Sequence, residues 1–200
     1  MLLQKLIYPF GNSIPAHVDE PSVVETAYRI SEGSINPNFF RYPSGYLNLL
    51  AIIFKINSVF DSNFSIKSGY QMSWVMSNIM MAAIPALVFL ICCFIQSYPT
   101  GLVGGFISLA SPLILQHSQF AIVDVSCTFF TIIFFSIITY RYRQNRTTLN
   151  QLLLLSILLG MAISMKYTAA LLILPFSIIN FHFIGENIEF RGTENFQVRI

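Results

Sequence analysis

The feature that most constrains this chain is a long stretch without charge. Residues 68–123 hold no Asp, Glu, Lys or Arg, and the charged residues of 68–185 are Asp124, Arg141, Arg143, Arg146 and Lys166. Over the whole chain 10% of residues are charged, against about 25% in soluble domains. A stretch with so few charges suits a lipid environment, where helices form because each helix satisfies its own backbone hydrogen bonds. The sequence therefore predicts an all-α, multi-spanning membrane bundle.

The apolar region divides into five predicted membrane spans, for each of which about 20 helical residues are needed. These are residues 74–95, 101–116, 124–140, 149–165 and 167–185. Gly101 and Gly105 permit close helix contact in the second span. The predicted domains are an external loop with juxtamembrane helices (1–72), the five spans (73–185) and a polar C-terminal segment (186–200). The short apolar start and the polar end indicate an N-terminal fragment that lacks a first spanning helix and is inactive alone.

Two shorter helices are predicted in the external loop. Residues 21–32 begin with a proline and end before Gly33, as helices prefer, and their apolar positions form one face. That helix is expected to lie along the membrane surface. Residues 46–60 are apolar but contain Lys55, which indicates a juxtamembrane helix, with a short span as the alternative.

Orientation follows from the basic loop at residues 141–146, because short positive loops stay in the cytoplasm. Provided that residues 46–60 do not cross the membrane, counting spans outward from this loop places five charged side chains together on the opposite, non-cytoplasmic face. They are Asp19, Glu20, Arg41, Asp124 and Lys166.

Each of these residues has a structural explanation beside a functional one. Asp124 and Lys166 border apolar segments, where charge costs a few kcal/mol, so they line a polar site or extend to water. Asp19 and Glu20 either carry chemistry or cap a helix, which is worth about 1 kcal/mol. His17 precedes this pair, but the spacing matches no metal motif, so no metal site is predicted.

Three motifs, taken in order, resemble the GT-C glycosyltransferases, most closely the branch of protein O-mannosyltransferases and aminoarabinose transferases (glycosyltransferase family 39-like). The first is His17-Val18-Asp19-Glu20-Pro21 with Asn36-Pro37-x-Phe39-Phe40-x-Tyr42-Pro43-Ser44. The second is Ala121-x-x-Asp124-x-x-x-Thr128-Phe129-Phe130, and the third is Leu159-Gly160-Met161-Ala162-x-x-x-Lys166-Tyr167-Thr168.

The resemblance implies a membrane enzyme that moves a sugar from a polyprenyl-phosphate donor to an acceptor hydroxyl with inversion. Asp19 would be the base, supported by Glu20, and Asp124 would position the acceptor or sugar, or help to bind a divalent ion of the kind some relatives use. The implied substrate-binding residues are Arg41, Tyr42, His117, Lys166 and Tyr167, although His117 by itself reads as an interface residue. Arg41 and Lys166 would receive the departing phosphate.

The acceptor is a lipid, a glycan or a protein, and the sugar is unspecified. A prokaryotic plasma membrane is favoured over the endoplasmic reticulum. The net charge of +2 is too small to indicate nucleic acid. The competing functions are a transporter, in which intramembrane charges mark ion paths, and a non-catalytic membrane subunit.

Overall fold

The computed structural model describes residues 17–34, 36–144, 149–178 and 180. Within those ranges every regular element is a helix. The helices are α2 (Glu20–Ser31), α3 (Gly45–Phe60), α4 (Ile66–Ile95), α5 (Tyr98–Leu109), α6 (Pro112–His117), α7 (Val123–Gln144), α8 (Leu149–Met165) and the 3-10 helix η1 (Tyr167–Leu172). Predictions for residues 1–16, for Arg146 and for residues 181–200 lie outside the described residues.

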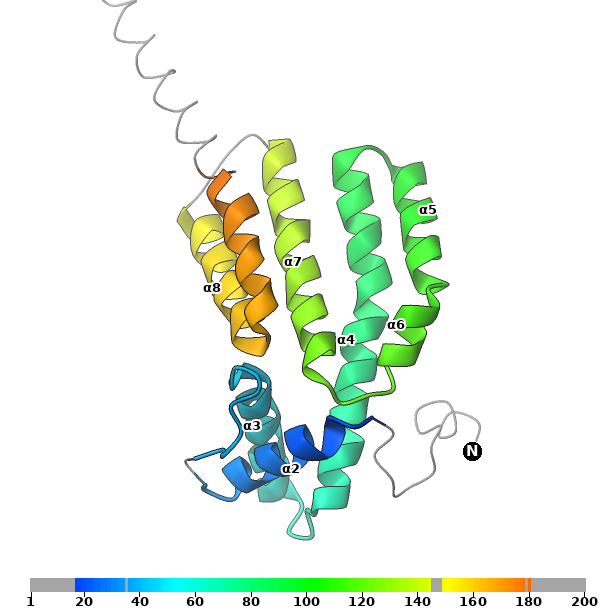
Figure 1. Ribbon diagram of the computed structural model, residues 1–200. Coiled ribbons are helices and arrows are strands. Elements are labelled where there is room, and N and C mark those ends of the chain that lie inside the picture. The colour runs from blue at the N-terminus through cyan, green and yellow to red at the C-terminus, as the bar shows by residue number, and fades with distance from the viewer. Residues whose placement is uncertain (1–16, 35, 145–148, 179, 181–200) are drawn as a thin grey trace, which may run out of the picture.

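The long helices run side by side, and α2 lies across one end of them (Figure 1). α4 contacts α5 and α7, α7 contacts α8, and α8 contacts η1. α3 packs on α2 and continues the row beyond the end of α8 (Figure 1). This end of the bundle, where α2, α3 and the starts of α7 and η1 meet, is called the α2 end below.

Two of the helices, α4 and α7, are long and apolar enough to cross a membrane. α7 agrees with the predicted span 124–140, whereas α8 has the predicted bounds 149–165 as a helix but is shorter than the two candidate spans. α4 begins at Ile66, earlier than predicted, because its first turns pack against α2 and α3 outside the apolar part. Of the predicted span 167–185, the described part is helical from Tyr167 to Ile178.

The predicted span 101–116 is wrong as a single helix. The structure divides it into α5 and α6, with Ser111 between them at φ −67° and ψ 117°. Pro112 explains the division, because its ring disfavours helical backbone at the preceding residue and it offers no N–H to the preceding turn. The predicted close contact is confirmed, since a Cβ on Gly105 would lie 3.2 Å from Cβ of Phe89 in α4.

The two short helices form as predicted, but α2 does not use its apolar face to rest on lipid. Val23, Val24 and Ala27 are fully buried, and the helix packs on α3 and α4. Gly33 ends the helix at φ +106°, a left-handed conformation that glycine adopts without strain. The apolar face of α2 is therefore covered by protein, and its position along a membrane surface stays a prediction.

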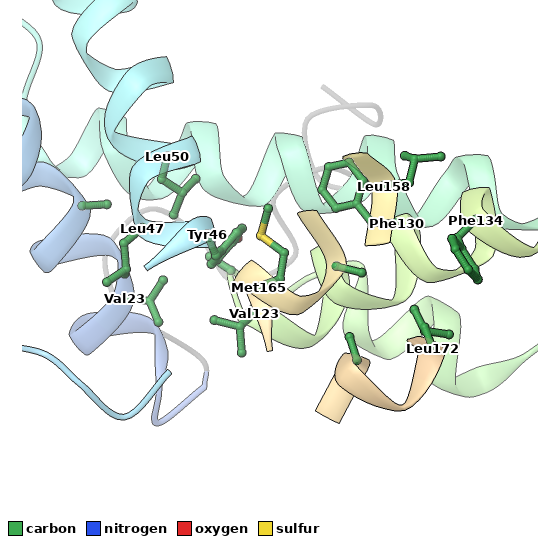
Figure 2. Packing of buried hydrophobic residues seen from close by; sticks show 14 of the residues in the cluster. Val23, Tyr46, Leu47, Leu50, Val123, Phe130, Phe134, Leu158, Met165 and Leu172 are labelled. Atoms are coloured by element: carbon green, nitrogen blue, oxygen red, sulfur yellow. The ribbon is translucent and has the colours of Figure 1, made fainter. Parts of the chain in front are cut away.

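The core of the α2 end joins the external helices to the bundle. Figure 2 shows Tyr46 at the start of α3 lying near Val123 and Met165, and all three belong to one buried cluster. Gly45 permits this junction, because a Cβ there would lie 2.5 Å from the carbonyl oxygen of Ser164 and 2.7 Å from its carbonyl carbon. The start of α3 is thus fixed directly against the end of α8.

The surface of the bundle is apolar where the helices have no neighbour. Exposed side chains on α5 include Val103, Phe106 and Ile107, and α8 exposes Leu153 and Ile157. Burying these groups in lipid is favourable, whereas water would have to solvate them.

The opposite end of the bundle carries arginine side chains. Arg143 donates from Nη1 to the carbonyl oxygen of Cys93 at 2.7 Å, which satisfies a backbone acceptor in the last turn of α4. Arg141 is buried and donates to Oδ1 of Asn180 at 2.9 Å. Basic and acidic groups of α7 therefore lie at opposite ends of that helix, as predicted.

Candidate functional site

Asp19 lies at the N-cap position of α2, yet its side chain makes no capping hydrogen bond. Instead, Nη1 of Arg41 donates to Oδ1 of Asp19 at 3.0 Å, and the Tyr42 hydroxyl donates to Oδ2 at 3.3 Å. The Asp19 side chain is 25% exposed. Capping is therefore the wrong explanation for Asp19, whose carboxylate is directed to the α2–α3 loop and is accessible to solvent.

Glu20 is buried, unlike its neighbour. Its Oε1 accepts hydrogen bonds from Nε1 of Trp74 and from the backbone N–H of Ala121, both at 2.8 Å. Its Oε2 accepts from the backbone N–H of His17 at 3.1 Å. These contacts connect the first residue of α2 to α4 and to the linker before α7.

A second carboxylate and cation meet at the same end of the bundle. Asp124, in the first turn of α7, forms an ion pair with Lys166 through Oδ1 and Nζ. Lys166 follows the last residue of α8 and has extended backbone, with φ −151° and ψ 132°. This break between α8 and η1 directs the side chain to α7, and the first-turn position of Asp124 suits a negative charge.

Tyr42 lies between the two ion pairs. Burial raises the pKa of its hydroxyl above the ordinary value, the Asp19 carboxylate raises it further, and Lys166 is close enough for its charge to act in the opposite direction. Counting spans predicted that the residues of both ion pairs share one face, and the structure brings the two pairs to the α2 end. Opposite charges therefore balance within each of the two pairs.

The remaining predicted site residues lie around this cluster. His117 is half-buried, and its Nδ1 is 2.9 Å from the carbonyl oxygen of Leu113 in its own helix. Phe120 packs its ring against both His117 and His17, which holds His117 beside the α2 end without a contact to either ion pair. Tyr167 adjoins Lys166 and is 64% exposed.

Among the described residues, no group of three or more His, Cys, Asp or Glu side chains is placed to hold a metal ion. His17, the nearest histidine to Asp19, uses Nδ1 to accept the backbone N–H of Asp19 at 3.1 Å. The carboxylates of the two ion pairs, Asp19 and Asp124, each have a cation as partner.

The sequence analysis did not predict two hydrogen-bond partners of Glu20, the Trp74 side chain and the backbone N–H of Ala121. Trp74 is the single tryptophan of the chain and starts an apolar segment, which is also typical of an interfacial aromatic residue. The backbone N–H of Ala121 carries no signal in the sequence. Reasoning also missed the contact between Gly45 and Ser164, because a close approach of two helices depends on their packing.

Within the described residues this is an all-helical protein, with two helices long and apolar enough to cross a membrane and a polar site at one end of the bundle. The sequence matches the model of the dolichyl-phosphate-mannose-protein mannosyltransferase family over residues 46–190. The chain therefore belongs to this family of GT-C glycosyltransferases. It matches no curated protein and no solved structure at a significant level.

The family match includes His117, Asp124, Lys166 and Tyr167, whereas residues 17–44 lie before it. The roles of Asp19, Glu20, Arg41 and Tyr42 therefore rest on the motif resemblance and on the geometry at the α2 end.

Proposed function

We propose that this protein transfers a sugar from a polyprenyl-phosphate donor to an acceptor hydroxyl, with inversion, at the non-cytoplasmic face of a membrane. Family membership supports glycosyl transfer in general. The single observation that carries the finer proposal is the meeting of two carboxylate–cation pairs, Asp19–Arg41 and Asp124–Lys166, at one end of an apolar bundle.

This arrangement suits a lipid-linked phosphate. The prenyl chain stays in the hydrocarbon, whereas the phosphate lies at the boundary, where Arg41 and Lys166 supply positive charge. Arg41 is 66% exposed, and its planar guanidinium binds two phosphate oxygens at once. Phosphate bound there competes with Asp19 for Arg41, so donor binding frees the carboxylate for the acceptor.

The chemical step is a direct displacement at the anomeric carbon. The acceptor oxygen bonds to that carbon while Asp19 takes the acceptor proton, as a general base within hydrogen-bond reach can. The bond between the anomeric carbon and the phosphate oxygen breaks, and its electron pair stays on the phosphate. Arg41 and Lys166 stabilise the negative charge that develops there. Asp124 would hold the acceptor or the sugar once Lys166 turns to the phosphate.

The apolar outer surfaces of α5 and α8 support a multi-pass arrangement, in which these helices cross the membrane with α4 and α7. The arginine-bearing end would then be cytoplasmic by the distribution of positive charge, and the α2 end would be outside. In a prokaryotic plasma membrane that face is where lipid-linked sugars are used for cell-envelope glycosylation. A protein acceptor is the one that the family description names.

The test is a transfer assay with the full-length protein in nanodiscs. A panel of radiolabelled polyprenyl-phosphate sugars is supplied with candidate acceptors, and release of polyprenyl phosphate is followed for wild type and for Asp19→Asn. Asp61→Asn is the matched control, because Asp61 is an exposed carboxylate at the end of α3 and uses Oδ1 to accept the N–H of Asn63, which asparagine also does.

The proposal predicts turnover with at least one donor, its loss in Asp19→Asn by about 100-fold or more, and wild-type turnover in Asp61→Asn. Full activity in Asp19→Asn would contradict the assignment of the base. Absence of turnover with every donor and acceptor would contradict the proposed reaction and favour the transport or non-catalytic function. Transport places charges near the bilayer midplane, whereas here they lie at helix ends.

A further inference from the structure

We infer that Glu20 is a positioning residue, which fixes the start of α2 against α4 and α7 and thereby sets Asp19 opposite Asp124. This inference rests on the proposed function and refines it. It separates the roles of two adjacent carboxylates that the sequence presents as a pair.

The geometry around Glu20 separates its carboxylate from solvent. The residue is 0% exposed, whereas the Asp19 side chain beside it is 25% exposed. From the part of the chain that the structure describes, the N–H groups of Trp74, Ala121 and His17 donate to its two oxygens at 2.8 to 3.1 Å. A carboxylate that is buried and accepts several hydrogen bonds is held in place, and it has no free face from which to take a proton.

The three partners come from three parts of the chain. Trp74 belongs to α4, Ala121 lies two residues before α7 begins, and His17 precedes α2. Glu20 therefore connects the helix that carries Asp19 to the helix that carries Asp124, three residues beyond Ala121. Because Asp19 is bonded covalently to Glu20, displacing Glu20 also displaces the base.

The hydrogen bonds also predict how substitutions differ. One oxygen of Glu20, Oε1, accepts from both Trp74 and Ala121, and Oε2 accepts from His17. In Glu20→Gln the amide oxygen retains the first two bonds and the amide nitrogen loses the third. Glu20→Ala loses all three. A positioning role thus permits rescue by glutamine, whereas a proton-transfer role does not.

The experiment measures turnover of the donor and acceptor and the emission of Trp74, the single tryptophan, for the full-length protein in nanodiscs. The variants are Glu20→Gln, Glu20→Ala and Trp74→Phe. The matched control is Glu32→Gln, an exposed glutamate at the other end of α2. Emission tests the contact without any reaction, so its outcome stands apart from that of the proposed function.

The inference predicts that Glu20→Gln keeps kcat within about 10-fold of wild type, the cost of about one hydrogen bond. Glu20→Ala loses about 100-fold in kcat, the cost of a misplacement near 1 Å, with KM for the donor unchanged. Trp74 emission shifts in Glu20→Ala and stays near wild type in Glu20→Gln and Glu32→Gln.

Trp74→Phe removes a donor while Glu20 stays in place, so a lower kcat in that variant supports positioning even where Glu20→Ala fails to fold. A kcat equally low in Glu20→Gln and Glu20→Ala, with Trp74→Phe fully active, would make Glu20 a proton-transfer residue. Unchanged emission in a folded Glu20→Ala would show that Glu20 and Trp74 are not in contact. If no donor reacts but emission shifts as predicted, the proposed reaction fails and the contact stands.

Discussion

Replacing Gly45 by alanine tests how closely the loop that carries Arg41 and Tyr42 is tied to the helix that precedes Lys166. The added Cβ would lie 2.5 Å from the carbonyl oxygen of Ser164 and 2.7 Å from its carbonyl carbon. Ordinary van der Waals contacts of a Cβ atom lie at 3.4–4 Å, and real Cβ atoms essentially never lie closer than 3.0 Å to another atom. Both atoms belong to the backbone, so no side-chain rotation relieves the overlap.

The start of α3 must therefore move by about 1 Å from the end of α8. Overpacking of this kind costs about 1–3 kcal/mol, which corresponds to a fall of about 5 °C in the apparent Tm for a chain of this length. Because the shift separates the Asp19–Arg41 pair from the Asp124–Lys166 pair, turnover is expected to fall by about 100-fold.

Gly160→Ala is the control, since a Cβ there meets no atom within 4 Å and the position lies in the same helix as Ser164. Alanine favours helix over glycine by about 1 kcal/mol, so this variant should match or exceed wild type. Thermal unfolding in detergent and turnover in nanodiscs measure both effects. Equal Tm and equal turnover in Gly45→Ala and Gly160→Ala would refute the close approach and its role in joining the two pairs.

Three further predictions concern charge, pH and orientation. Lys166→Met leaves Asp124 without its cationic partner and lowers the free energy of unfolding. The double variant Lys166→Met/Asp124→Asn should regain a free energy of unfolding within about 1 kcal/mol of wild type but no turnover. Recovered turnover in the double variant would show that the pair is structural. Tyr42 has a raised pKa, so its contribution to stability is complete below the ordinary pKa near 10 and is lost as pH rises through the raised value. Above about pH 10 the Tm of wild type should therefore fall more steeply than that of Tyr42→Phe, and parallel curves would contradict this. In a variant without native cysteines, Asp61→Cys in sealed right-side-out vesicles should react with an impermeant maleimide, and Gln144→Cys only after permeabilisation; the reverse would invert the orientation.

Much of the helical pattern could be predicted because lipid and helix ends impose simple rules on sequence. The charge-free stretch indicated the apolar helices, and Gly33 and the proline after Glu20 marked the ends of α2. The span 101–116 was predicted wrongly because average hydropathy is insensitive to one proline, whereas the backbone before Pro112 is not.

The candidate site was predictable in its members but not in its pairing. Counting spans outward from the basic loop at residues 141–146 placed Asp19 and Asp124 on one face. It could not show that Asp19 contacts Arg41 while Glu20 is buried against Trp74, because two adjacent residues at a helix start differ in environment only after packing. Backbone donors such as the N–H of Ala121 have no residue type that reveals them.

The central claim is that the α2 end performs a direct displacement with Asp19 as the base, and the anomeric configuration of the product tests it most directly. The product formed by wild type from a donor of defined configuration is identified by NMR, with Asp19→Asn measured in parallel. An inverted anomeric centre and loss of product in Asp19→Asn are expected. A retained configuration does not result from a single back-side displacement, so it would refute the mechanism with Asp19 as the base of a direct displacement.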